Sequence, residues 1–321
     1  MGVDKKLLFG VDDSDFSRQA LARAGDLQRN NPNLKITIFH GDSDANFSFM
    51  AKILKLSPDE LEKHQRLWSL EEKNILQKAK EALTESGFDS KRVTTFFDQG
   101  CNDPSESMMK LAGSQGFETV AVARWGAKTL SRQIMGSVTC RLVNMADIPA
   151  LWIMDPRIRS HDVLVTLVGA SISQRVMEYT LQYFAHLKES RFTFFHVIPA
   201  PPPQIWNYGS IRDKDSFEEQ QEKIRRWVEE KTDKVTQIAD EGRQRLIKAG
   251  IPEQNIAIKL KPQKQGIARD ILKELETGNY GIILMGRKGS KKIREFQLGS
   301  KANKLLYTAH TLITCILNDT Y

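Results

Sequence analysis

Residues 282–300 read IILMGRKGSKKIREFQLGS, and residues 119–137 read TVAVARWGAKTLSRQIMGS. Each stretch starts as a short apolar run typical of a strand, and continues into a glycine-bearing loop that leads to a helical pattern. The dipeptide Phe39-His40 recurs as Phe195-His196 at an offset of 156. A second offset, of 163, is shared by three pairs: Gly126 and Gly289, Gly136 and Gly299, and Ser137 and Ser300. Two constant offsets that differ by seven residues indicate a duplicated module with one net insertion between the matched segments.

The spacing of the apolar runs predicts the fold of each copy. Short apolar runs alternate with helical patterns, which is the signature of βαβ units and of a parallel sheet covered by helices on both faces. The sequence therefore predicts an α/β protein of two tandem domains, residues 1–155 and 161–321, joined by a short linker. Five parallel strands are expected in each domain, at residues 6–11, 35–40, 92–97, 119–123 and 150–153, and at residues 163–168, 192–198, 255–260, 281–285 and 312–317.

One helix in each copy is expected to be long. A serine followed by a glutamate three residues later predicts a helix start, and a glycine after the last turn predicts a helix end. About 30 residues separate these marks, so both helices are expected to run past the edge of their sheets. The marks are Ser57, Glu60 and Gly87 in the first copy, and Ser216, Glu219 and Gly250 in the second.

Composition and charge narrow the class of protein. Hydrophobic residues make up 40% of the chain and charged residues 27%, which is typical of a globular protein in water. No apolar run reaches the roughly 18 residues of a membrane span, and no secretory pattern is evident, so a cytoplasmic location is expected. The formal net charge is +7. The basic excess lies in the second half, partly around its glycine loop, where it would favour an anionic ligand.

The chain lacks the sequence patterns of familiar catalytic and metal sites. The three cysteines, Cys101, Cys140 and Cys315, have no spacing that pairs metal ligands or builds a redox motif, so all three are predicted to be reduced and structural. The strand-end histidines His40 and His196 are likewise interpreted as structural. No pairing of a nucleophile with a base is evident, so the chain is not expected to be an enzyme.

The glycine loops indicate phosphate binding. Glycine lets the backbone approach a ligand closely, because no Cβ stands in the way. At the start of a helix, free N–H groups and the positive end of the helix dipole favour a phosphate group. The spacing is neither that of a Walker A loop nor that of a dinucleotide fingerprint. Each loop is therefore a candidate phosphate site of another kind.

The pattern G-x-x-G-x9-G-S after a fourth strand resembles that of the universal stress protein family. The resemblance covers both copies and includes the first-strand ending Val11-Asp12-Asp13-Ser14. It implies a tandem member with a doubly wound sheet of strand order 3-2-1-4-5 in each domain, and with ATP, alone or with Mg²⁺, at the carboxyl edge. It also implies a cytoplasmic stress-response or regulatory protein that binds ATP, or another adenine nucleotide, in one or both domains.

The same resemblance implies one site in each copy. The aspartate and the end of the second strand would lie at the base and ribose, and the glycine loop at the phosphates. Ala123 stands where the first copy should have its first glycine, and Val168 replaces the aspartate of the second copy. The matching residues are Asp12, Gly126, Gly136, Ser137 and Val138 in the first copy, and Val197, Gly286, Gly289, Gly299 and Ser300, followed by Lys301, in the second.

Several alternatives stay open on the sequence. Both loops could connect strand to helix without a ligand, and Asp12 could be only a turn or N-cap residue. The basic second half could bind a polyanion, although no nucleic-acid motif accompanies it. The protein could also hydrolyse ATP slowly. The resemblance further implies an intrachain pseudo-dimer, formed by the strands at 149–153 and 312–317, which could itself form a homodimer.

Overall fold

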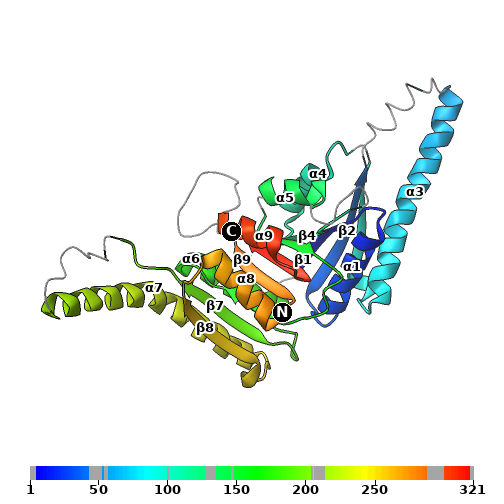
Figure 1. Ribbon diagram of the computed structural model, residues 1–321. Coiled ribbons are helices and arrows are strands. Elements are labelled where there is room, and N and C mark those ends of the chain that lie inside the picture. Colours follow the sequence, from blue (N-terminus) through cyan, green and yellow to red (C-terminus); the bar gives the residue numbers. More distant parts are fainter. Residues whose placement is uncertain are drawn as a thin grey trace. The chain divides into compact units, whose positions relative to one another are not determined.

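The structure is a computed structural model, and it describes residues 5–42, 53, 57–99, 101–126, 135–145, 148–203, 205, 214–287 and 300–318. Two compact units are distinguished, one built mainly from residues 1–159 and the other mainly from residues 160–293. Each unit contains a parallel sheet flanked by helices (Figure 1).

The first unit alternates strands with helices, and its strands pair in parallel. The strand order is β3-β2-β1-β4-β5, so the first strand lies at the centre, beside the fourth. The elements are β1 (Lys5–Gly10), α1 (Asp15–Gln28), β2 (Leu34–Asp42), α3 (Pro58–Glu85), β3 (Val93–Gln99), α4 (Pro104–Gln115), β4 (Thr119–Ala123), α5 (Ser137–Met145) and β5 (Ala150–Met154).

The second unit repeats this plan, with the strand order β8-β7-β6-β9-β10. The α/β class predicted from the sequence is therefore confirmed, and each of the ten predicted strands overlaps an observed one. The elements are β6 (Val163–Thr166), α6 (Ala170–Phe184), β7 (Phe192–Ile198), α7 (Lys214–Lys248), β8 (Ile256–Pro262), α8 (Ile267–Gly278), β9 (Ile282–Gly286), α9 (Ser300–Thr308) and β10 (Ile313–Leu317).

The central strands are apolar because both of their faces are covered. Leu7, Leu8 and Phe9 of β1 are fully buried, as are Val163, Leu164 and Val165 of β6. Such a strand is anchored along its whole length by the helices on both sides. The residues that follow it, at the carboxyl edge of the sheet, therefore have a rigid support.

The long helices begin and end largely as predicted. Ser57 and Glu60 form a capping box at the start of α3, with the Ser57 N–H donating to Glu60 Oε2 at 2.8 Å. Gly87 and Gly250, just after α3 and α7, have φ values of +91° and +92°, which favour glycine. The predicted start of α7 is wrong, because the helix already begins at Lys214 and Ser216 lies inside it.

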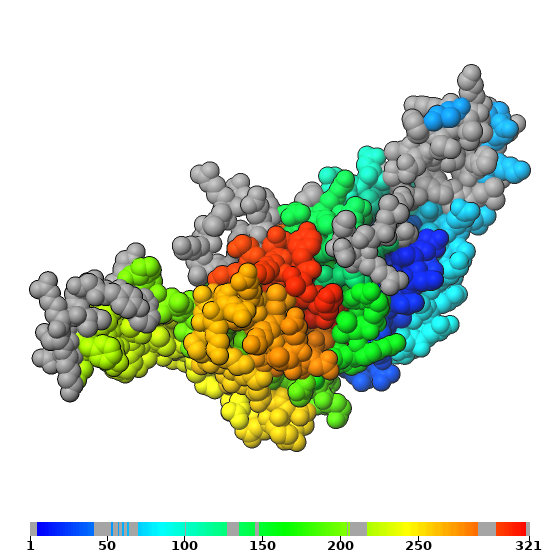
Figure 2. All heavy atoms as spheres, viewed as in Figure 1, coloured from blue at the N-terminus to red at the C-terminus, as the bar shows by residue number. Residues whose placement is uncertain are grey.

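Helix α7 has 35 residues, and its N-terminal part stands away from α8 (Figures 1 and 2). That part carries ion pairs within the helix, from Arg225 to Glu222 at 2.8 Å and to Glu229 at 2.7 Å, and from Arg226 to Glu222 at 2.8 Å. Pairs at these spacings support a helix that has little packing of its own. None of the described helices is both long and apolar enough to cross a membrane.

Candidate functional site

The carboxyl ends of β1 and β4 bring Asp12 and Gly126 together. The two strands pair in parallel, so the residues that follow them emerge at the same edge of the sheet. A Cβ added to Gly126 would lie 2.4 Å from Asp12 Oδ2. The φ of Gly126 is not positive. The glycine is therefore required by the close approach of the carboxylate and not by an unusual backbone conformation.

Asp12 is also held by its own turn. Its Oδ1 accepts hydrogen bonds from the Ser14 backbone N–H at 3.1 Å and from the Ser14 hydroxyl at 2.5 Å. Ser14 in turn is the N-cap of α1, where its Oγ accepts from the Ser17 N–H at 3.1 Å. Asp12 is thus a turn residue whose other oxygen, Oδ2, faces Gly126. A ligand role for Asp12 stays a prediction.

Gly136 lies beside Gly126 at the start of α5. The Gly136 N–H donates to the Arg124 carbonyl at 3.0 Å, and a Cβ on Gly136 would lie 3.4 Å from the Gly126 nitrogen. Ser137 and Val138 then form the first turn of α5. The structure therefore brings all five predicted residues of the first copy to one edge of the sheet.

Ala123 occupies the position of the first glycine without backbone strain. It is buried at the end of β4, its φ is not positive, and its carbonyl accepts from the Thr139 hydroxyl at 2.9 Å. In the second unit, Gly286 ends β9, and a Cβ there would lie 2.2 Å from Ile172 Cγ1. The two copies thus differ in whether a Cβ fits at the end of the fourth strand: it fits at Ala123 and would clash at Gly286. Gly286 makes room for Ile172, whose counterpart in the first copy is Phe16.

A cluster of side chains that the sequence did not predict surrounds Trp125, the residue before Gly126. The rings of Phe16 and Trp125 meet edge to face, with centroids 5.1 Å apart. The Arg157 guanidinium carbon lies 4.4 Å from the centroid of Trp125. Buried Asp155 holds Arg157 through bonds of 2.8 and 2.6 Å, which raise the pKa of Arg157. A cation held by Asp155 therefore lies beside the residue that precedes Gly126. No sequence signal indicated this contact, because Phe16, Trp125 and Arg157 are far apart in the chain.

The second copy keeps the turn but lacks the carboxylate. The Val168 N–H donates to Ser173 Oγ at 2.9 Å, as the Asp12 N–H does to Ser17 Oγ at 3.1 Å. Val197 is buried in β7. Ser300 and Lys301 begin α9, and burial lowers the pKa of Lys301. The predicted residues Gly289 and Gly299 lie outside the described residues.

The strand-end histidines make the same bond in both units. His40 Nδ1 lies 2.8 Å from the Val11 carbonyl oxygen, and His196 Nδ1 lies 2.7 Å from that of Leu167. Burial lowers the pKa of His196, although its bond to Leu167 acts in the opposite direction. Only His40 has an acidic partner among the described residues, because Glu72 of α3 contacts its Nε2.

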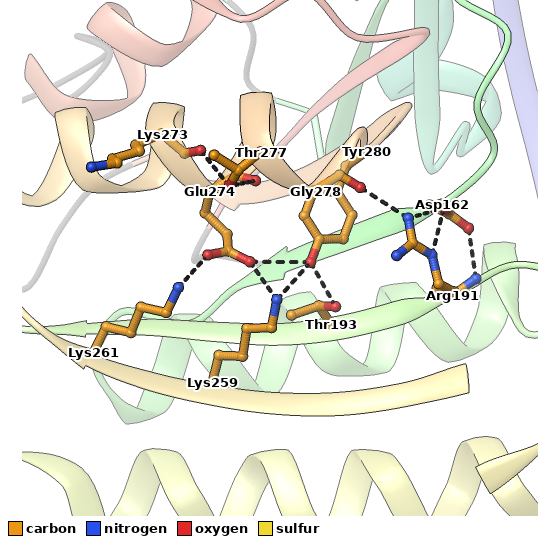
Figure 3. Close-up of polar contacts among 10 residues, drawn as sticks. All are labelled: Asp162, Arg191, Thr193, Lys259, Lys261, Lys273, Glu274, Thr277, Gly278 and Tyr280. Atoms are coloured by element: carbon orange, nitrogen blue, oxygen red, sulfur yellow. Dashed lines mark hydrogen bonds and ion pairs between the residues drawn. The ribbon is translucent and has the colours of Figure 1, made fainter. Parts of the chain in front are cut away.

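A polar network distinguishes the second sheet from the first (Figure 3). Buried Glu274 of α8 accepts from the ammonium groups of Lys259 and Lys261 of β8, each at 2.6 Å. The Tyr280 hydroxyl donates to Thr193 Oγ1 at 2.9 Å. At the offset of 163, the corresponding residues of the first copy are Phe96, Asp98, Leu111 and Phe117. The same position in the fold is therefore mainly aromatic and aliphatic in one copy and charged in the other.

A family model described as the universal stress protein family matches the chain twice, at residues 5–153 and 160–316. The chain belongs to this family. The two matches also show the tandem arrangement of universal stress protein domains that the repeat predicts. The comparison with curated proteins found no match.

Solved structures support the universal stress protein fold over the whole length. A universal stress protein from Archaeoglobus fulgidus DSM 4304 has a TM-score of 0.64 and 15% identity, and the match covers 99% of both chains. A putative universal stress protein from Pseudomonas aeruginosa UCBPP-PA14 has a TM-score of 0.56 and 11% identity, and covers 98% of this chain and 93% of that one. At such identities the likeness concerns the fold alone.

The described part of this universal stress protein contains neither a cluster of metal ligands nor a disulfide. Within it, no group of three or more histidine, cysteine or acidic residues could hold a metal ion. The three cysteines are not in disulfides, and Cys101 and Cys315 are buried. Burial raises the pKa of the Cys101 thiol.

Proposed function

We propose that this protein is a cytoplasmic regulatory member of its family that binds ATP or another adenine nucleotide at the carboxyl edge of its first domain. The observation that carries the proposal is the contact between the Asp12 carboxylate and Gly126, next to Gly136 and the start of α5. A Cβ-free surface at a helix N-terminus suits phosphate oxygens. The turn at Asp12 supplies a carboxylate of fixed orientation for a hydroxyl or amino group.

Each residue of the first site has a role in this proposal. Asp12 would accept from the base or ribose, while Gly126, Gly136, Ser137 and Val138 would surround the phosphates, with Ala123 as their buried support. Mg²⁺, where present, would be held mainly by the phosphates, because the described residues offer no cluster of metal ligands. The second domain would bind more weakly, through the residues Val197, Gly286, Gly289, Gly299, Ser300 and Lys301, because Val168 lacks the carboxylate.

The nucleotide would act as a bound effector and not as a substrate. In this proposal any hydrolysis of ATP would be slow, because Asp12 Oδ1, which could act as a base, already accepts from the Ser14 N–H and hydroxyl. The two tandem domains fit an intrachain pseudo-dimer. In this proposal the pseudo-dimer is the working unit, and its occupancy by nucleotide is the signal that a partner protein detects.

Mass spectrometry of nucleotides released from freshly purified protein tests the proposal directly. The expected result is an adenine nucleotide at up to one equivalent per chain, together with a rise in melting temperature when ATP is added to the stripped protein. GTP at the same concentration serves as the control ligand. Absence of both released nucleotide and ATP-dependent stabilisation would contradict the proposal and favour a scaffold without ligand.

A further inference from the structure

The chain leaves the ends of β4 and β5 at adjacent points of the first sheet. Met154, the last residue of β5, is paired in register with Ala123, the last residue of β4. One step further along, the Arg124 N–H donates to the Met154 carbonyl at 2.8 Å. The segment that contains Trp125 and Gly126 therefore starts beside the segment that follows β5. A charged side chain early in that second segment is a candidate neighbour for a ligand of the glycine loop.

Asp155, the first residue after β5, fixes the orientation of the Arg157 guanidinium. The Asp155 side chain is only 1% exposed. Its Oδ1 accepts from Arg157 Nε at 2.8 Å, and its Oδ2 accepts from Arg157 Nη2 at 2.6 Å. The Arg157 backbone N–H donates to the same Oδ1 at 3.2 Å. Two parallel bonds from one edge of the guanidinium hold it in a single plane and direct its third nitrogen, Nη1, away from the carboxylate.

Trp125 covers one face of the same guanidinium. The Arg157 Cζ lies 4.4 Å from the centroid of Trp125 and 5.9 Å from that of Phe16. Arginine can stack on an aromatic face without losing its charge or the donors at its free edge. The Arg157 side chain is 43% exposed, and its Nη1 has no partner among the residues that the structure describes. Arg157 thus presents an oriented pair of N–H groups beside the residue that precedes Gly126.

A second arginine makes the surroundings of Arg157 more positive. Arg124 is only 6% exposed. Burial lowers the pKa of Arg124, Asp155 opposes this effect, and Arg157 lowers that pKa further. Arg124 and Arg157 therefore repel each other, although Asp155 attracts both. An anion bound at Arg157 Nη1 would relieve this repulsion.

The second copy does not repeat this arrangement. Its sequence has neither the aromatic ring, nor the carboxylate, nor the guanidinium at the equivalent positions. A contact of this kind with an anion is therefore expected in the first domain alone. At the offset of 163, Lys288, Asn318 and Thr320 correspond to Trp125, Asp155 and Arg157.

We propose that Arg157 binds the outer phosphates, β and γ, of a nucleotide in the first domain, and that Asp155 is the residue that positions it. This inference rests on the nucleotide binding proposed above, in which the glycine loop surrounds the phosphates. Arg157 contacts Trp125 of that same loop. An arginine whose other edge is already held loses little further side-chain entropy when it binds phosphate. The first domain is thereby expected to bind ATP more tightly than ADP, and ADP more tightly than AMP.

Isothermal titration of the full chain with ATP, ADP and AMP tests this inference. Arg157→Gln should weaken ATP binding about tenfold, the low end for loss of one charge-assisted hydrogen bond, and should change AMP binding less than about twofold. Arg159→Gln is the matched control, because it removes the same charge at an exposed position two residues further along, and it should follow wild type.

The outcomes separate this inference from the proposed function. Equal ATP affinity in Arg157→Gln and wild type would overturn the role of Arg157 and leave nucleotide binding intact. A wild type that binds none of the three nucleotides would contradict the proposed function itself. Equal weakening of ATP and AMP would also overturn the inference, because it would indicate general damage to the site and not loss of a contact with the outer phosphates.

Two further variants test the geometry of the contact. Arg157→Lys keeps the positive charge but not the planar fork, so its ATP affinity should fall between those of Arg157→Gln and wild type. Asp155→Asn keeps Arg157 but replaces one accepting oxygen by an amide that only donates, so the preference for ATP over AMP should fall severalfold. An unchanged preference in Asp155→Asn would refute the positioning role of Asp155.

Inorganic tripolyphosphate distinguishes a nucleotide site from a general site for anions. It offers the same outer phosphates without base or ribose, so it should bind wild type at least about tenfold more weakly than ATP. Its remaining affinity should fall in Arg157→Gln. Binding of tripolyphosphate as tight as that of ATP would overturn the nucleotide as the ligand of Arg157.

Discussion

Asp12 and Gly126 depend on each other at the carboxyl ends of β1 and β4. The carboxylate occupies the space that a side chain on residue 126 would need, since the Cβ position lies 2.4 Å from Oδ2. Because the φ of Gly126 is not positive, alanine at this position is compatible with the backbone. A substitution at residue 126 can therefore disturb the Asp12 carboxylate without disturbing the backbone.

Gly126→Ala is expected to displace the Asp12 carboxylate and leave the fold intact. Loss of one well-placed contact of about 1.4 kcal/mol lowers affinity tenfold, so ATP should bind the first domain about tenfold more weakly. Isothermal titration with ATP measures the effect. Gly113→Ala is the control, because Gly113 lies inside α4, outside the proposed site, and has nothing within 4 Å of its Cβ position. Unchanged affinity in Gly126→Ala would argue against Asp12 as a ligand.

Glu274→Gln is expected to destabilise the second domain by about 1–2 kcal/mol, because it removes charge-assisted hydrogen bonds from half-exposed lysines. Burial alone would raise the pKa of Glu274, but its bonds to Lys259 and Lys261 prevail and lower that pKa. Its contribution is therefore present at neutral pH and is lost as pH falls below about 4. Urea unfolding should show a difference from wild type at pH 7 that shrinks at pH 3.5. Glu276→Gln, on the exposed face of α8, should stay close to wild type at both.

At the scale of elements, the glycines that follow the long helices adopt a left-handed backbone conformation, with positive φ. Gly250 has a φ of +92°, and the nearest atom to an added Cβ would be 3.6 Å away, on Lys188. A substitution there meets no steric clash. Any loss of stability therefore comes from the left-handed backbone alone.

Gly250→Ala should lower the free energy of unfolding by about 1 kcal/mol. Gly113→Ala should have the opposite sign, because Gly113 lies inside α4, has no positive φ and has nothing within 4 Å of the Cβ position. There alanine is expected to stabilise by about 0.5–1 kcal/mol. Chemical denaturation of both variants measures the two changes in the free energy of unfolding. Equal changes in both variants would show that helix propensity, and not the positive φ, determines the effect of alanine at residue 250.

The positions of helices and strands were predictable where a local sequence pattern determines them. The alternation of apolar runs located all ten strands, and the capping box at Ser57 located the start of α3. The start of α7 was misplaced, because Ser216 has the same residue type as Ser57 but lies within a helix that begins at Lys214. At the site, the glycines were predictable from their repeat. The contact of His40 with Glu72 was not, because it joins residues 32 apart whose meeting depends on how α3 lies on the sheet.

At the scale of the whole molecule, one buried histidine of the second copy is expected to make the stability of the chain depend on pH. In the second domain, burial lowers the pKa of His196, so the unfolded chain binds a proton more readily than the folded one. The stability that this histidine provides is present above about pH 6.5 and is lost as pH falls. The chain should consequently lose stability between pH 7 and pH 5.

His196→Asn is expected to reduce the loss of stability between pH 7 and pH 5, because an asparagine amide can donate to the Leu167 carbonyl without titrating. Wild type should lose up to about 1.4 kcal/mol per pH unit relative to this variant. Calorimetry of the full chain over this range measures the difference. His310→Asn, at an exposed position, is the control and should follow wild type. A steeper loss in His196→Asn than in wild type would contradict the expected direction.

The packing of Gly286 against Ile172 restricts how the gene can recombine. Alanine from the first copy, carried into the second by exchange between the repeats, would place its methyl carbon 2.2 Å from Ile172 Cγ1. The reverse exchange, glycine replacing Ala123, only removes a methyl group. Conversion between the repeats is therefore tolerated in one direction and opposed in the other, so the halves of this duplicated gene are expected to keep diverging.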